Sequence, residues 1–275
     1  MKIATIRTAE GTRAARLDDG GYVPLDAPDA GALLEREGWA DAAAAASGDA
    51  LGPDTALAPV VPQPRKILCV GLNYRKHILE MGRDLPEHPT LFAKFAEALI
   101  GPADDIQLAP ESSAVDWEAE LALVIGRTVR RATEREAADA IAGFTVMNDV
   151  TMRDWQFRTR EWLQGKTFEG TTPLGPVLVT PDELPGGVRP ALSITCRVNG
   201  EETQSADTSD LVFDPVDLVR YASTIVTLRP GDVLATGTPG GVGHARKPPR
   251  YLAGGDTVVT EVEGIGRLEN TARTA

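Results

Sequence analysis

The sequence contains few of the residues that mark secreted or membrane-spanning proteins. Only two cysteines occur in 275 residues. Cys69 and Cys196 stand in apolar runs without the spacing of a metal site, so we expect both to be reduced and buried. No apolar run reaches the ~18 residues needed to span a bilayer, and the first residues lack the apolar stretch of a secretory signal. We therefore expect a cytoplasmic protein that makes no membrane contact.

Histidines and basic residues are also scarce. Three histidines without an HExxH pattern disfavour a zinc site with His or Cys ligands. The 28 lysines and arginines are outnumbered by 40 aspartates and glutamates, and the net charge of −12 argues against a nucleic-acid partner. A small anionic substrate remains compatible with this charge, because a few basic side chains can reverse the field inside one cleft.

Two glycine-containing segments imitate nucleotide-binding loops without meeting their patterns. Residues 165–167 (GKT) lack the glycine that begins a phosphate-binding loop. Residues 234–243 (LATGTPGGVG) do not form the GxGxxG pattern that opens a helix. Both segments still offer groups to an anion: Lys166 in the first, and the Thr238 hydroxyl with accessible backbone N–H groups in the second.

Four prolines between positions 53 and 64 divide the chain, because proline opposes regular structure. We expect a small N-terminal α+β domain over residues 1–60, with strands at 3–7 and 22–25 and a helix at 30–46. A larger domain is expected over residues 65–275. In it a hairpin turns at Asn199-Gly200, and Asp214-Pro215 begins a helix. Strands and helices do not alternate regularly, which disfavours a doubly wound parallel sheet and indicates an α+β fold.

The first candidate site is the segment DWEAELALVIG at residues 116–126. Side chains alternate faces along a strand, so Glu118 and Glu120 share a face that is otherwise apolar. Two carboxylates placed this way repel each other unless a cation compensates, and a hard divalent ion prefers oxygen ligands. A solvated strand end explains the same pattern equally well, because exposed carboxylates are the rule.

A third carboxylate, Asp149, follows an apolar stretch and would be delivered into a cleft by the end of a strand. Arg153 and Gln156 follow it, and all three lie on one face if a helical turn begins at Asp149. His77 and Glu80 are three residues apart, so on a helix the carboxylate could orient the imidazole as a general base requires. A His–Glu pair at this spacing is more often a surface feature.

Seven segments, taken in order, resemble the fumarylacetoacetate hydrolase family. They cover about residues 65–270: GLNYRKHILE, EAE, NDVTMRDWQ, GKTFEGTTPLGP, TSDLVF, PGDVLATGTPGGVG and EGIGRLEN. The resemblance implies a mixed β-sandwich roll that forms a homodimer and binds Mg²⁺ or Mn²⁺. It assigns the metal to Glu118, Glu120 and Asp149, the water-activating pair to His77 and Glu80, and the substrate to Arg153, Gln156, Lys166 and Thr238.

The activity that the resemblance implies is metal-dependent cleavage of a C–C bond in a small keto acid of the acylpyruvate or fumarylpyruvate type. His77, oriented by Glu80, would activate water, and Lys166 with Arg153 would stabilise the enolate that leaves as pyruvate. Decarboxylation of an oxaloacetate-like acid and isomerisation of a hydroxymuconate pass through a similar enolate and stay open. A non-catalytic metal-binding protein is a further alternative, which is disfavoured because it would need no general base.

Overall fold

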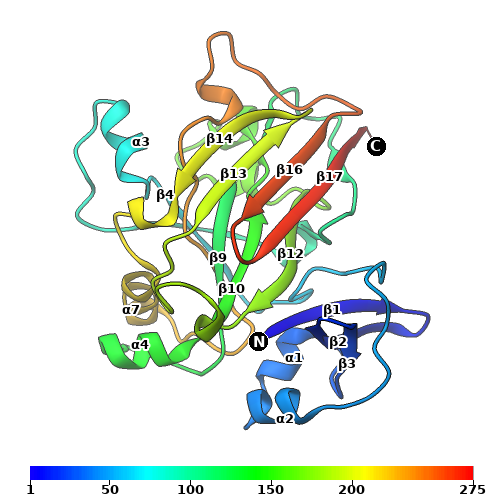
Figure 1. Cartoon of the computed structure of the whole chain (residues 1–275). Coiled ribbons are helices and arrows are strands. Elements are labelled where there is room, and N and C mark those ends of the chain that lie inside the picture. Colours follow the sequence, from blue (N-terminus) through cyan, green and yellow to red (C-terminus); the bar gives the residue numbers. More distant parts are fainter. Residues whose placement is uncertain (275) are drawn as a thin grey trace.

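The computed structural model describes residues 1–274, and its framework is a ten-stranded mixed sheet (Figure 1). Its strand order is β3-β2-β1-β12-β10-β9-β15-β4-β5, with β6 paired to β12. The strands are β1 (Lys2–Thr8), β2 (Gly11–Asp18), β3 (Gly21–Pro24), β4 (Ile67–Gly71), β5 (Thr90–Lys94), β6 (Leu99–Ile100), β9 (Ala119–Ile125), β10 (Ile141–Asn148), β12 (Thr172–Val179) and β15 (Val233–Ala235).

A five-stranded sheet of order β14-β13-β16-β17-β7 lies across β9 and β10, in front of them in Figure 1. Its strands are β7 (Ile106–Leu108), β13 (Ser193–Val198), β14 (Glu201–Asp207), β16 (Thr257–Val262) and β17 (Gly266–Thr274). A short pair, β8 (Val115–Asp116) and β11 (Thr151–Met152), completes the strands of the described chain. This two-sheet packing confirms the expected α+β fold with a mixed β-sandwich.

Helices are short and lie at the edges of the sheets. They are α1 (Ala30–Leu34), α2 (Trp39–Ala45), α3 (Arg75–Glu80), α4 (Glu134–Ala140), α5 (Arg153–Gln156), α6 (Leu163–Lys166) and α7 (Pro215–Ile225), with 3-10 turns η1 (Ala96–Ala98), η2 (Pro181–Glu183), η3 (Thr208–Asp210) and η4 (Gly243–Ala245). The N-terminus of α7 is capped as predicted, because Asp214 accepts a hydrogen bond from the backbone N–H of Asp217 at 2.9 Å. None of the helices in residues 1–274 combines the length and the apolar character required to cross a bilayer.

The N-terminal segment differs from its prediction in two ways. The expected helix over residues 30–46 is broken into α1 and α2, because Gly38 adopts a left-handed φ of 69° at the start of α2. Strand β2 was not predicted from its largely polar sequence and is formed by pairing with β1. In turn β1 pairs with β12, so the first strands extend the main sheet. The division of the chain near residue 60 stays a prediction.

Strand β9 runs through the middle of the core and is buried on both faces. Leu121, Leu123 and Ile125 pack in the cluster between the two sheets, whereas Ala122 and Val124 pack on the opposite side. This alternation is the predicted one, and it places Glu120 on the side of Ala122 and Val124. The hairpin at Asn199-Gly200 is also confirmed, with φ of 53° and 81° at its two central residues.

Candidate metal and keto-acid site

The candidate site forms where β9 begins and β10 ends. The two strands are antiparallel neighbours, with Glu120 paired to Met147 and Ala119 to Asn148. Glu118 immediately precedes β9 and Asp149 immediately follows β10, so the pairing brings them together, and the Asp149 N–H donates to the Glu118 carbonyl at 2.8 Å. The position of all three carboxylates therefore follows from strand register.

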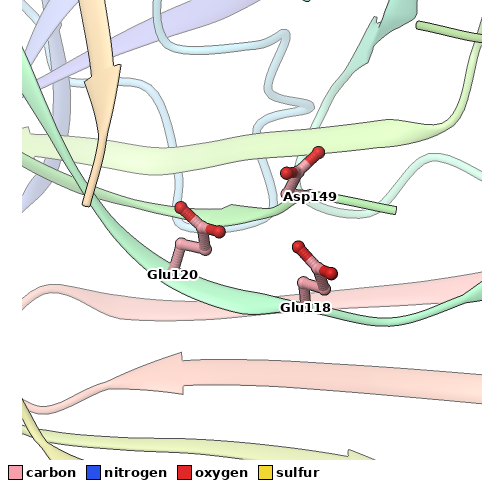
Figure 2. Close-up of side chains that lie close together, drawn as sticks. All are labelled: Glu118, Glu120 and Asp149. Carbon is pink, nitrogen blue, oxygen red and sulfur yellow. The ribbon is translucent and has the colours of Figure 1, made fainter. Parts of the chain in front are cut away.

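Glu118, Glu120 and Asp149 point toward one another from these two strands (Figure 2). Each offers a carboxylate oxygen, and the three oxygens lie within 4.8 Å of one another. The residues are 6%, 1% and 0% exposed. The solvated strand end considered for Glu118 and Glu120 is therefore wrong, and the pair belongs to a buried acidic triad.

Two members of the triad are neutralised by basic side chains. Lys166 Nζ lies 2.6 Å from Glu118 Oε2 and 2.8 Å from Asp149 Oδ2, and Lys94 Nζ lies 2.7 Å from Asp149 Oδ1. Burial alone would raise the pKa of Asp149, but the two ammonium groups outweigh it and hold that pKa below the usual value. Asp149 is therefore ionised.

Glu120 has no cationic partner among the described residues. Its Oε2 accepts one hydrogen bond, from the Gly237 N–H at 2.9 Å. Burial raises the pKa of Glu120 well above its usual value, and the neighbouring charges of Asp149 and Glu118 raise it further. The charge of Lys166 and the Gly237 N–H oppose this rise only in part. A divalent cation held by all three carboxylates would supply the missing positive charge. The oxygen-only donor set suits Mg²⁺ or Mn²⁺.

Lys166 lines the cavity, and its ammonium group is paired with two carboxylates of the triad. It ends the short helix α6, is 2% exposed, and lies between Glu118 and Asp149 with Phe92 beneath its ammonium at 4.8 Å. Burial alone would lower the pKa of Lys166, but the carboxylates of Asp149 and Glu118 raise it, so the side chain stays protonated. Its charge belongs first to the triad.

Arg153 and Gln156 lie together on α5, as predicted, and both are buried. Arg153 Nη1 donates to Gln156 Oε1 at 3.0 Å, and Nη2 lies 2.7 Å from Glu118 Oε1 without the alignment of a hydrogen bond. Its Nε donates to Asp116 at 2.8 Å. The helical face shared with Asp149 was not predicted correctly, because α5 begins at Arg153, after the two-residue strand β11.

The Thr238 hydroxyl is occupied by the protein. It donates to the Ala119 carbonyl at 3.0 Å and accepts from Gln204 Nε2 at 2.8 Å. The assignment of Thr238 to the substrate, which the resemblance implies, stays a prediction, and it would require the hydroxyl to exchange its bond to Ala119 for one to the substrate. The segment itself is correctly placed, because β15 pairs with β9 and directs residues 237–243 past the triad.

His77 and Glu80 are carried by α3, which projects from the body of the protein at the left of Figure 1. His77 is half-buried and Glu80 exposed, and no ion pair joins them within residues 1–274. A methyl group on Gly240 would lie 3.0 Å from His77 Nδ1, so the imidazole stands against the glycine-rich loop. Burial lowers the pKa of His77 below 6.5, partly opposed by the charges of Glu80 and Glu118. The imidazole is therefore neutral at pH 7.

A cavity of about 380 Å³ joins these parts. His77 lines it from α3, Glu118 and Glu120 from β9, and Arg153, Gln156 and Lys166 from the helices after β10. Apolar and aromatic side chains form the rest of its wall, including Phe92, Phe157, Trp162 and Val242. Every residue assigned to the site by the resemblance except Glu80 and Asp149 lines this cavity.

Two buried residues of the site were missed in the sequence. Lys94 is the single charged residue of β5 and stands at its end. This position is the sequence signal that could have indicated a buried lysine. Asp116 lies two residues before Glu118 and is 0% exposed. Its partners come from distant segments, so sequence spacing carries no signal for them.

Comparison with known proteins agrees with this geometry. Residues 66–273 match the family described as "Fumarylacetoacetate (FAA) hydrolase C-terminal". The oxaloacetate tautomerase Fahd2a, mitochondrial, of Rattus norvegicus is 48% identical over 217 residues, which span 78% of this chain and 68% of that protein.

Two solved structures are similar over 100% of this chain. The fumarylacetoacetate hydrolase of Exiguobacterium antarcticum is covered over 100% of its own chain, with a TM-score of 0.87 and 32% identity. The 5-carboxymethyl-2-hydroxymuconate delta-isomerase of Mycobacterium smegmatis is covered over 99%, with a TM-score of 0.80 and 34% identity. The α+β sandwich, the buried acidic triad and these similarities agree, and the chain belongs to the fumarylacetoacetate hydrolase family.

Proposed function

We propose that this chain is a divalent-metal-dependent enzyme that interconverts the keto and enol forms of a small 2-keto acid such as oxaloacetate. The observation that carries the proposal is Glu120, a buried carboxylate without a cation in a triad that opens into the cavity. The naming of a 48% identical relative as an oxaloacetate tautomerase supports the choice of substrate. The hydrolase expected from the sequence becomes the second candidate.

Charge in the site favours an anionic substrate once a metal is present. The triad and Asp116 supply four carboxylates, while Lys94, Lys166 and Arg153 supply three cations. This group carries one excess negative charge, which a divalent cation converts to one excess positive charge. A carboxylate next to a keto group then enters a field that attracts it.

Glu118, Glu120 and Asp149 would hold the metal, which supplies a Lewis acid that polarises the keto oxygen when bound. Arg153 and Lys166 stabilise negative charge on the oxygen as it develops. His77, neutral at pH 7, faces the same cavity and can take the proton from the carbon next to the keto group. The C–H electron pair moves into the enolate, and the imidazolium returns the proton to oxygen or to carbon.

A second candidate is hydrolysis of a C–C bond in a longer 2,4-diketo acid. The cavity of about 380 Å³ has an apolar wall that includes Phe157 and Trp162, which could accommodate a larger acyl group. In that reaction His77 would activate water for attack on the distal carbonyl. Tautomerisation requires only proton transfer within the substrate, and no water has to be activated. It therefore does not require His77 to be oriented by Glu80, with which it forms no ion pair in residues 1–274.

The deciding experiment compares four substrates with Mg²⁺ or Mn²⁺: the enol of oxaloacetate, oxaloacetate followed for decarboxylation, an acylpyruvate and a hydroxymuconate. Of the four reactions, ketonisation of the enol, followed by the loss of its ultraviolet absorbance, should have the highest enzyme-catalysed rate. This catalysed rate should be lost in Glu120→Gln. An acylpyruvate cleaved with a higher kcat/KM would favour the hydrolase. If the wild type were no faster than Glu120→Gln on any of the four substrates, a non-catalytic metal-binding protein would be the remaining interpretation. The homodimer and the cytoplasmic location stay predictions.

A further inference from the structure

Asp116 is a buried carboxylate beside the triad that belongs neither to the triad nor to the residues lining the cavity. It ends β8, lies two residues before Glu118 and is 0% exposed. Burying a carboxylate is costly unless its oxygens are fully hydrogen-bonded. The arrangement around Asp116 therefore needs a structural explanation.

Both oxygens of Asp116 are saturated. Oδ1 accepts from the N–H groups of Trp117 at 2.9 Å and Gly243 at 2.7 Å. Oδ2 accepts from the His244 N–H at 3.0 Å and from Arg153 Nε at 2.8 Å. Two donors on each oxygen use the acceptor capacity of a carboxylate, so none is left for a ligand.

The donors to Asp116 include groups from two segments that border the cavity. Arg153 belongs to α5, whereas Gly243 and His244 begin the turn η4 after the glycine-rich loop. Arg153 and His244 both line the cavity. The His244 ring lies 5.2 Å from that of Phe157, the residue that follows α5, and its Nδ1 is 2.9 Å from the Tyr251 hydroxyl. Asp116 therefore hydrogen-bonds to both segments and connects them.

The turn fits tightly over Asp116. A Cβ added to Gly243 would lie 1.9 Å from the Arg250 carbonyl oxygen and 2.8 Å from both Asp116 Oδ1 and the Trp117 ring. Only glycine allows the backbone this close approach. The turn is therefore packed closely against both Asp116 and the Arg250 backbone.

We infer that Asp116 is a positioning residue that fixes Arg153 and the 243–244 turn in the geometry required for substrate binding. The inference rests on the proposed function of the cavity. Asp116 acts through Arg153: with Nε held by Asp116 and Nη1 by Gln156, the guanidinium plane is fixed beside Glu118. Loss of this anchor displaces a substrate-binding cation without removing it.

Asp116→Asn tests the inference in the full-length protein. The amide replaces one acceptor oxygen with N–H donors that face two other donors. We expect kcat/KM for the keto acid to fall about 10²-fold, the scale of a misplacement of ~1 Å in a substrate-positioning group. The rise in melting temperature with Mn²⁺ should persist, because the triad is unchanged. Turnover within threefold of wild type would overturn the inference.

A double-mutant cycle with Arg153→Met separates positioning from general loosening of the fold. If Asp116 acts through Arg153, Asp116→Asn should cost less than tenfold in the Arg153→Met background, compared with about 10²-fold alone. An equal loss in both backgrounds would contradict the inference. A wild-type protein inactive on every keto acid would instead overturn the proposed function.

Asp232→Asn is the matched control, because Asp232 is also 0% exposed and is paired 2.7 Å from Lys66, outside the cavity wall. It should lower the melting temperature and leave kcat/KM unchanged. If Asp116→Asn does not fold, Arg153→Lys carries the test, since it removes the Nε donor to Asp116 while keeping the positive charge. A raised KM is expected, and wild-type kinetics would overturn the inference.

Discussion

Two regions of the site are built from opposite kinds of structure. We call Glu118, Glu120 and Asp149 the strand wall, and α3 with His77 and Glu80 the helix wall. The strand-wall residues are at most 6% exposed and are fixed by the register of β9 and β10. The helix wall projects from the body, and its Leu79 is 56% exposed.

In the proposed function, this difference separates metal binding from proton transfer. Charges concentrated on buried strands cannot move apart, so their repulsion favours a divalent cation. A short exposed helix opens at low free-energy cost, so it can admit a substrate and then bring a base to it. Each wall should therefore fail in its own way when changed.

The largest effect is expected in the strand wall. Glu120→Gln keeps the size of the side chain but removes the charge that has no cationic partner. Activity with Mg²⁺ should fall about 10⁴-fold, because a metal contributes several kcal/mol of charge stabilisation. Steady-state rates over a range of Mg²⁺ concentrations measure the change. Glu37→Gln, an exposed substitution in the N-terminal segment, should be indistinguishable from wild type. Activity restored by high Mg²⁺ would show that Glu120 assists the site without being required.

His77→Ala tests the helix wall and should have the next largest effect. Removing a general base should lower kcat about 10²- to 10³-fold, while Mn²⁺ still raises the melting temperature. In the wild type, kcat should fall only below pH 6.5, because burial lowers the pKa of His77 and the protonated imidazole cannot accept a proton. An acid limb above pH 6.5, or a variant with wild-type kcat, would assign the proton transfer to another group.

Without metal, the buried carboxylate of Glu120 should lower the free energy of unfolding at neutral pH. The raised pKa means that the folded protein binds the Glu120 proton more tightly than the unfolded chain does. The free energy of unfolding should therefore decrease as the pH rises above 4.5, the usual value for Glu. Glu120→Gln should remove this slope and stabilise the metal-free protein by about 1–3 kcal/mol at pH 7. Chemical denaturation with chelator present measures it. A less stable variant at pH 7 would contradict the uncompensated charge.

The smallest effect is expected for Glu80→Gln. Glu80 is exposed and unpaired with His77, so its influence is that of a screened surface charge. We expect kcat to fall about two- to fivefold. The acid limb should move to lower pH, because the charge of Glu80 raises the pKa of His77. A loss as large as that of His77→Ala would mean that the two residues act as one unit during turnover.

The sequence predicted the strand wall better than its surroundings. Period-two alternation placed Glu118 and Glu120 on one face, and the end of an apolar run placed Asp149 in a cleft, because both depend on local structure. The grouping of the three carboxylates came from the family resemblance. Lys94 and Asp116 were missed because their partners lie on other segments. The hydrogen bonds that join the Thr238 hydroxyl to Ala119 and Gln204 were likewise not predicted. Such contacts are set by the tertiary fold.

The central claim is that the strand wall binds the metal and the helix wall moves the proton. Calorimetric titration of Mn²⁺ into wild type, Glu120→Gln and His77→Ala tests it most directly. The account predicts one site per chain in wild type and in His77→Ala, with equal affinity, and no measurable binding in Glu120→Gln. Wild-type binding by Glu120→Gln, or loss of binding in His77→Ala, would contradict it.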